Sequence, residues 1–258
     1  APDGGPDRAA PTPADAWTRL VREAWVTARL EHPSIVPIYD AGVDRDGKPY
    51  YTMRLIAGRS LADVLAEPQT GNQRRGLLRN FVAVTQAMAY AHSHGIVHRD
   101  LKPSNIMVGA FGETQIVDWG LAGFVDEDIA SAFAQATGEQ VPTRHTGVIG
   151  TPAYMSPEQA AGKGVDERAD VWALGAILFE LLTGQAWSPA STVSAVANRV
   201  PTRADGRAEL RAAQVAPELI AIIDKATAAH ANRRYAHAGD LHDDRLAHLS
   251  AARWPRAR

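Results

Sequence analysis

The chain has 258 residues, of which 45% are hydrophobic, and a formal net charge of −2 at pH 7. This length can bury a substantial core as one domain or two lobes, and the near-neutral charge gives no reason to expect non-specific nucleic-acid binding. The absence of cysteine excludes disulfides, cysteine-ligated metal sites and thiol nucleophiles. No secretory signal opens the chain, and its longest apolar run, residues 171–182, is too short to span a bilayer, so a cytoplasmic location is expected.

Residues 1–13 contain four prolines and two glycines, which is typical of a linker or tail. A helix is expected to follow, because Thr12 can cap its first turn and Pro13 suits that turn. Pro33 is expected to end the helix. Apolar residues at helical spacing give this helix one apolar face: Trp17, Leu20, Val21, Ala24, Trp25 and Ala28.

Two β-rich runs, residues 35–43 and 49–56, come next. They are joined by residues 44–48, whose sequence DRDGK favours a hairpin connection. Residues 96–118 are expected to form short strands and loops, with a turn at residues 109–112.

The rest of the chain is predicted to be mostly helical. Residues 121–150 are small and polar without clear periodicity, which indicates a mobile loop. Helices are expected at residues 60–66, 76–94, 158–161, 167–182, 216–228 and 238–252. The sequence therefore predicts an α+β fold with a small N-terminal part containing the hairpin and a larger helical C-terminal part.

The most informative motif is HRDLKPSN at residues 98–105, followed by DWG beginning at Asp118. Asp100 can accept a hydroxyl proton, and Lys102 can neutralise phosphate charge. Asn105 and Asp118 can together hold a divalent metal. Phosphoryl transfer needs this inventory, because the reaction depends mostly on positioning and charge neutralisation. The alternative interpretation is a surface loop with solvated charges.

Five sequence blocks, by their order and spacing, resemble the bacterial branch of the eukaryotic-type serine/threonine protein kinases, over roughly residues 14–250. The blocks are residues 98–105, 118–120, 150–158 (GTPAYMSPE), 170–175 (DVWALG) and 234–235 (RY). The resemblance implies a two-lobed kinase-like fold of the α+β class. It also implies transfer of the ATP γ-phosphate to serine and threonine hydroxyls of a protein substrate.

The resemblance assigns a role to each residue of the catalytic blocks. Asp100 would orient the substrate hydroxyl and accept its proton, and Lys102 would contact the transferring phosphate. Asn105 and Asp118 would bind the magnesium ions that bridge the ATP phosphates, with manganese as an alternative metal. Thr151, paired with Lys102, resembles serine/threonine specificity and not tyrosine specificity.

The same resemblance implies a nucleotide site. Glu23 matches the family's helix glutamate, and Met53 takes the gatekeeper position. Hinge backbone is expected beside the adenine from Arg54 to Ile56, with Met107 beneath it.

Regulatory residues also follow from the resemblance. Arg99 resembles the residue that binds a phosphorylated activation loop through charge-assisted hydrogen bonds. Thr143 and Thr146 are candidate phosphoacceptors, with ordinary loop threonines as the alternative. Trp119 stands where the family usually has phenylalanine, and its ring is expected to fill an apolar slot beneath the helix that carries Glu23.

Three residues resemble structural ones. Glu158 and Arg234 resemble a buried ion pair that anchors the substrate-side loop to the C-terminal helices, and Asp170 resembles the residue that braces the catalytic-loop backbone. His92 and His94 lie close to the catalytic motif, but no further ligand cluster accompanies them, so a metal site there is not favoured.

The chain departs from the family pattern before Glu23. In the family this glutamate pairs with a strand lysine that holds ATP phosphates, and a glycine-rich loop lies upstream. Residues 1–22 contain no lysine, and Gly4-Gly5 has no strand–turn–strand context. The expected small lobe is therefore reduced to one helix and a hairpin.

The expected divisions are a tail, a small-lobe remnant, a large lobe and a basic tail, at residues 1–13, 14–57, 58–252 and 253–258. Trp17 and Trp25 would lack a covering sheet in such a remnant. They are expected to be covered by a second chain, by a homodimer partner or by residues 1–16.

These features leave two functions open. The intact catalytic residues favour a serine/threonine protein kinase, whereas the missing phosphate-binding elements favour a pseudokinase scaffold without phosphotransfer. A small-molecule kinase such as an antibiotic phosphotransferase is a third class, but it lacks the protein-substrate platform at residues 150–158. Neither a nucleic-acid partner nor a membrane segment is expected.

Overall fold

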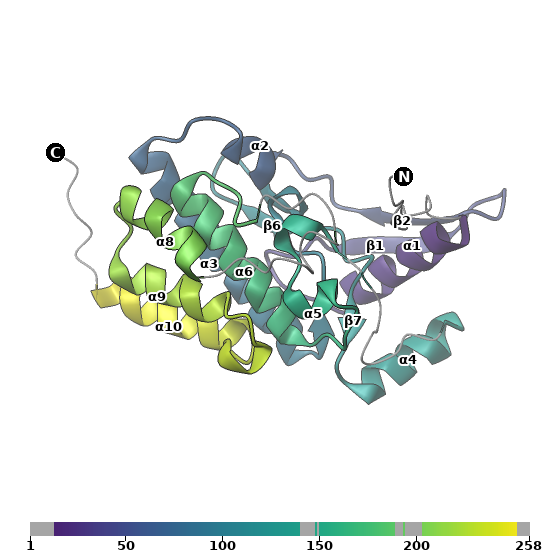
Figure 1. The fold of residues 1–258 in the computed structure, drawn as a ribbon. Helices are drawn as coiled ribbons and strands as arrows, with labels where there is room; N and C mark the ends of the chain where they lie inside the picture. The colour runs from purple at the N-terminus through teal and green to yellow at the C-terminus, as the bar shows by residue number, and fades with distance from the viewer. Residues whose placement is uncertain (1–12, 140–147, 149, 189–192, 194–202, 252–258) are drawn as a thin grey trace, which may run out of the picture.

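The computed structural model describes residues 13–139, 148, 150–188, 193 and 203–251, and it is mostly helical (Figure 1). The described strands form two two-stranded sheets and one three-stranded sheet. This mixture agrees with the expected α+β class. The part of the chain that the structure describes contains no helix with the length and hydropathy needed to cross a membrane.

The N-terminal part is one helix beside one antiparallel hairpin. Its elements are α1 (Pro13–Thr27), β1 (Ile38–Val43) and β2 (Pro49–Met53). The hairpin turn is closed by Asp44, whose Oδ1 accepts the N–H groups of Asp46 and Lys48 at 2.9 and 2.8 Å. The predicted hairpin is therefore confirmed, with shorter strands than the β-rich runs suggested.

Helix α1 begins at Pro13, as predicted, but ends before the expected stop at Pro33. Arg29 and Leu30 donate to carbonyls three residues back, at 3.1 and 3.2 Å. These i→i−3 bonds tighten and finish the helix before the proline is reached. Thr12, the expected cap, lies outside the described residues.

The larger part is built around α6 (Glu167–Thr183), which is enclosed by other helices along most of its length (Figure 1). Gly175 permits the close approach of α9, since an added Cβ would lie 2.8 Å from the Ala226 Cβ and 2.7 Å from Thr227 Cγ2. The other helices of this part are α2 (Leu61–Leu65), α3 (Gly71–Ser93), α8 (Arg203–Ala212), α9 (Pro217–Ala226) and α10 (Ala238–Ala251).

Two helix predictions need correction. Helix α3 starts five residues before the predicted position 76, because a capping box stabilises an earlier start. In this box the Gln73 side chain accepts the Thr70 N–H at 2.8 Å, and Thr70 Oγ1 accepts the Gln73 N–H at 3.4 Å. Helix α8 was not predicted, because it is strongly polar; Leu210 is its buried anchor.

The prediction of a mobile loop over residues 121–150 is wrong for much of its described part. This segment forms β7 (Gly123–Phe124) and helix α4 (Glu127–Thr137). Asp126 caps the helix by accepting the Asp128 N–H, and Gly138 ends it in the left-handed region at φ 74°. The apolar face of α4 consists mainly of small alanines, so its periodicity is hard to see in the sequence.

Short elements connect the helices and carry the loops of the candidate site. The predicted short strands and the turn at residues 109–112 are confirmed. These elements are β3 (Arg59–Ser60), β4 (Ile96–Val97), η1 (Pro103–Asn105), β5 (Ile106–Val108), β6 (Thr114–Ile116), η2 (Pro152–Tyr154), α5 (Pro157–Ala160) and η3 (Ala231–Arg233).

The expectation for the two exposed tryptophans is partly wrong. Trp25 is half-buried by its own chain, through ring contacts with Phe124 of β7 and Phe133 of α4 at centroid distances of 5.5 and 5.2 Å. Trp17 keeps 39% of its surface exposed. Helix α4 supplies the cover for Trp25 that the sequence prediction assigned to a second chain or to residues 1–16.

Candidate active site

Asp100, Lys102 and Thr151 form a closed triangle of polar contacts. Lys102 Nζ lies 2.6 Å from Asp100 Oδ2 and 2.8 Å from Thr151 Oγ1. The Thr151 hydroxyl also donates to Asp100 Oδ1 at 2.8 Å. The structure therefore brings the predicted acid, amine and hydroxyl from two distant loops to one place.

Asn105 and Asp118 lie next to this triangle. The Asn105 side-chain amide donates to the Asp100 carbonyl at 3.0 Å, which leaves its Oδ1 as the atom able to bind a metal. The Asn105 carbonyl accepts the Val117 N–H at 3.0 Å. This bond attaches the loop carrying Asp118 to residues 98–105, the candidate catalytic loop. Asp118 is exposed and has the rare φ of 63°.

The donor set fits a magnesium ion that is shared with a phosphate ligand. Within the described residues, no group of three or more His, Asp or Glu side chains could hold a metal by itself. Asn105 and Asp118 offer two hard oxygen ligands, and Mg²⁺ usually binds one or two protein oxygens together with water and substrate phosphates.

Asp170, at the start of α6, fixes the catalytic loop from below. Its Oδ2 accepts the His98 N–H at 2.7 Å and its Oδ1 accepts the Arg99 N–H at 2.9 Å. His92 Nε2 lies 3.0 Å from the same carboxylate. Burial alone would raise the pKa of Asp170, but the contacts with His92 and His98 hold that pKa below its ordinary value. These contacts help to hold Arg99 at φ 68°.

Trp119 fills a closed apolar slot. Its side chain is almost completely buried, and its ring lies 4.6 Å from the His98 ring between centroids. His98 Nε2 in turn lies 3.2 Å from the Val117 carbonyl.

Glu23 of α1 reaches this loop without a lysine partner. It accepts hydrogen bonds from the N–H groups of Asp118 and Trp119 and from the Tyr51 hydroxyl. Burial, followed by the negative charge of Asp118, raises the pKa of Glu23 above its ordinary value. Tyr51 of β2 is therefore a side-chain donor to Glu23.

Two buried arginines lie between α1 and the catalytic loop. Burial lowers the pKa of Arg99 to about 10. The negative charge of Asp170 opposes this shift, whereas the positive charge of Arg22 lowers the pKa further. Among the described residues, none of the three Arg99 guanidinium nitrogens has a hydrogen-bond partner, and neither has Arg22 Nε. The positive charge of Arg22 is partly offset by Glu139. The predicted phosphoacceptors Thr143 and Thr146 fall outside the described residues.

The loop at residues 150–158 is anchored to the helices and to the catalytic loop. The Arg234 guanidinium contacts both Glu158 oxygens, at 2.6 and 2.9 Å, and also donates to the Arg168 carbonyl at 3.0 Å. The Gln159 amide donates to the Arg99 carbonyl at 2.8 Å. The Glu158–Arg234 ion pair therefore joins two segments that are far apart in sequence.

The expected nucleotide residues occupy two separate strands and a connection. Met53 ends β2 and is 45% exposed, while Arg54 donates its N–H to the Pro37 carbonyl at 3.4 Å. Ile56 and Met107 are half-buried, and Met107 lies on β5. Met53 and Met107 therefore lie in different sheets, because β2 pairs with β1 and β5 pairs with β3 and β6.

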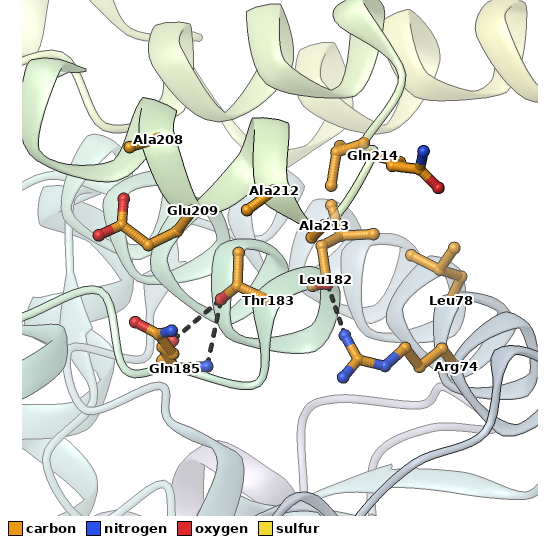
Figure 2. A pocket seen from close by; sticks show the side chains of 11 residues that line it. Arg74, Leu78, Leu182, Thr183, Gln185, Ala208, Glu209, Ala212, Ala213 and Gln214 are labelled. Carbon is orange, nitrogen blue, oxygen red and sulfur yellow. Dashed lines mark hydrogen bonds between the residues drawn. The ribbon is translucent and has the colours of Figure 1, made fainter.

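A wide cavity of about 790 Å³ lies elsewhere, between α3, the end of α6 and α8 (Figure 2). Arg74 closes one side of it by donating to the Leu182 carbonyl at 2.6 Å. None of the residues assigned to catalysis lines this cavity. It is therefore separate from the candidate active site.

Sequence reasoning missed four residues of the site. His92 was considered only as a metal ligand, and its spacing from the catalytic motif was the one available signal. Arg22, Tyr51 and Gln159 carried no signal, because their roles depend on contacts across the fold.

A family model described as the protein kinase domain matches residues 9–244. A serine/threonine-protein kinase PknD of Protochlamydia amoebophila is 40% identical over 181 residues, which are 64% of this chain and 18% of the relative. PknB proteins of Mycolicibacterium smegmatis and Mycobacterium leprae are 37% and 35% identical, and each match covers 88% of this chain and 35% of the relative. The chain thus spans about a third or less of the length of these relatives.

Proposed function

Because the chain belongs to the protein kinase domain family, a family of transferases, we propose that it transfers the γ-phosphate of ATP to serine and threonine hydroxyls of protein substrates. The observation that carries this proposal is the triangle of Asp100, Lys102 and Thr151. It positions a carboxylate to receive a hydroxyl proton beside an amine that can neutralise phosphate charge.

In this mechanism Asp100 orients the substrate hydroxyl and takes its proton. Lys102 steadies that carboxylate and faces the negative charge that develops during transfer. Thr151 donates to the second Asp100 oxygen and so limits its rotation. Asn105 and Asp118 would hold magnesium, which neutralises the phosphates of ATP when it is bound.

The remaining assignments belong to the same proposal. The adenine side of the nucleotide would be contacted by Met53, Arg54, Ile56 and Met107. The proposed divisions are a tail, a small-lobe remnant, a large lobe and a basic tail, at residues 1–13, 14–57, 58–252 and 253–258.

The proposed small lobe lacks the glycine-rich loop and the strand lysine. Among the described residues no lysine contacts Glu23, which instead accepts a hydrogen bond from the Tyr51 hydroxyl. Positioning effects contribute several kcal/mol to enzymatic rates, and a loss of ~3 kcal/mol slows turnover roughly hundredfold. Phosphotransfer by this chain is therefore expected to be slow. A pseudokinase that binds partners without transfer is the alternative that the Tyr51–Glu23 contact favours.

Nucleotide binding and transfer separate these two functions. Magnesium-ATP should raise the melting temperature of the wild-type chain and not that of Asp118→Asn. Phosphate transfer to a generic protein substrate should occur with the wild type and be lost in Asp100→Asn, while Asp128→Asn, an exposed carboxylate change in α4, serves as the control. Binding without any transfer would support the scaffold, and the absence of both would refute the kinase.

Regulation is proposed through Arg99. A phosphate on Thr143 or Thr146 would supply a hydrogen-bond acceptor for the three Arg99 guanidinium nitrogens, which have none among the described residues. It would also offset the mutual repulsion of the Arg99 and Arg22 charges.

A partner chain is proposed at the groove between α1 and β1. This groove of about 450 Å³ is lined by Trp17, Tyr39, Val43 and Tyr50, each of which is at least 39% exposed. Exposed apolar patches of this kind mark interaction surfaces. Concentration-dependent self-association that Trp17→Ser abolishes would identify a homodimer, and a monomeric wild-type chain would argue against one.

A further inference from the structure

Helix α4 is attached to α1 by a cluster of three aromatic rings. Trp25 of α1, Phe124 of β7 and Phe133 of α4 lie 5.2 to 5.5 Å apart between centroids. Phe133 is fully buried, and its ring meets that of Trp25 edge to face at 89°. Such pairs stabilise beyond the area they bury. Figure 1 shows α4 at the α1 end of the molecule, apart from α9 and α10.

A polar contact joins the same two segments. The Thr18 hydroxyl donates to Glu139 Oε1 at 2.8 Å, and Glu139 also attracts Arg22. Thr18, Arg22 and Trp25 are spaced four and three residues apart, so they lie on one face of α1. That face is turned toward α4 and toward Glu139, which lies two residues beyond the end of α4.

The Glu23 side chain extends from α1 next to this face and contacts the loop that carries Asp118. It accepts the N–H groups of Asp118 and Trp119 and a hydrogen bond from the Tyr51 hydroxyl. The position of α1 therefore sets the position of the backbone that presents Asp118.

We propose that Phe133 is a positioning residue for phosphoryl transfer, acting through Trp25 and Glu23 on the metal-binding residue Asp118. The effect on phosphoryl transfer rests on the proposed function, whereas the coupling of α4 to the loop of Asp118 rests on the contacts above. Helix α4 serves as a brace that keeps α1 against the loop of Asp118. Displacement of α4 would loosen the metal site without any change in the metal ligands.

The test compares Phe133→Ala, Phe133→Leu and the wild-type chain by hydrogen exchange and by magnesium-ATP binding. Phe133→Ala should speed amide exchange roughly tenfold or more in α1 and at residues 118–120, while α9 and α10 stay unchanged. The melting-temperature shift caused by magnesium-ATP should shrink in the same variant. Phe133→Leu refills most of the cavity and should restore both readouts. Phe111→Ala is the matched control, because Phe111 is 94% exposed on the β5–β6 turn.

The outcomes separate this inference from the proposed function. Faster exchange confined to α4, with residues 118–120 unaffected, would overturn the brace. If the wild-type chain does not respond to magnesium-ATP, the kinase proposal fails while the exchange data still decide the coupling. If Phe133→Ala also speeds exchange in α9 and α10, Thr18→Val provides the second test, because it removes the polar contact with Glu139 without leaving a cavity. This variant should speed amide exchange at residues 118–120, and no change there would refute the coupling.

Discussion

The His92 imidazole lies 3.0 Å from the Asp170 carboxylate, which also accepts two backbone N–H groups of the catalytic loop. His92 Nδ1 accepts the Ala238 N–H at 3.1 Å, so this ring links α3, α6 and the start of α10. Both side chains are almost completely inaccessible to solvent. The unusual backbone of Arg99 thus depends on a polar network in the interior, which makes catalytic-loop geometry a matter of core stability.

Asp170→Asn should reduce the free energy of unfolding by about 3–5 kcal/mol, because it leaves buried donors facing an amide. Urea unfolding of both chains measures this difference. Since the folded-state pKa of Asp170 lies below its unfolded value of about 3.9, its contribution is present above that pH and is lost as pH falls further. The variant should therefore lose less stability than the wild type below about pH 4. A wild-type acid transition unchanged by the substitution would contradict this account.

Glu158→Ala should also destabilise the chain, by about 3–5 kcal/mol, because Arg234 is left as a buried charge without its carboxylate partner. The exposed pair of Glu67 and Arg59 offers a matched contrast at a similar distance. Its side chains are more than half exposed, so Glu67→Ala should leave the denaturant midpoint nearly unchanged. Equal effects of the two substitutions would show that burial does not decide the strength of these pairs.

The residue types of the candidate site could be predicted because they lie in short motifs. Asp100, Lys102 and Asn105 occupy one run of residues, whereas the contact of Thr151 with Asp100 joins positions far apart in sequence and appears only in the fold. The hairpin and α6 could be predicted for a similar reason, since turn residues and a continuous apolar run are local signals. Each of these features is decided within a few turns of chain.

Other features depend on contacts that no local pattern records. Helix α4 is held by the contact of Phe133 with Trp25, and the rest of its sequence consists mostly of small and polar residues. Tyr51 meets Glu23 only after the hairpin packs on α1. The cover of Trp25 was assigned to a second chain or to residues 1–16 for the same reason, because the position of α4 cannot be read from the sequence.

Arg99→Met should stabilise the unphosphorylated chain by roughly 1–3 kcal/mol, because it removes a buried cation whose guanidinium has no partner and keeps an apolar stem. The pKa of Arg99 is lowered to about 10, so the destabilising charge is fully present at neutral pH and the stability gain should shrink above about pH 10. Thermal unfolding across this pH range measures both effects. A melting temperature that falls on substitution would mean that an anion already neutralises Arg99.

Tyr51→Phe should destabilise the chain by about 1–3 kcal/mol, since it removes a donor to the half-buried Glu23 carboxylate while the ring remains. Glu23→Gln forms the second corner of a double-mutant cycle, because its amide no longer carries the charge that the hydroxyl stabilises. The combined variant should lose less than the sum of the two single effects if the hydroxyl acts on Glu23. Tyr39→Phe, which removes an exposed hydroxyl from β1, controls for the loss of a phenol elsewhere in the hairpin. Strictly additive losses would show that Tyr51 supports the hairpin and not the glutamate, and would leave the backbone N–H groups of Asp118 and Trp119 as the contacts that hold Glu23.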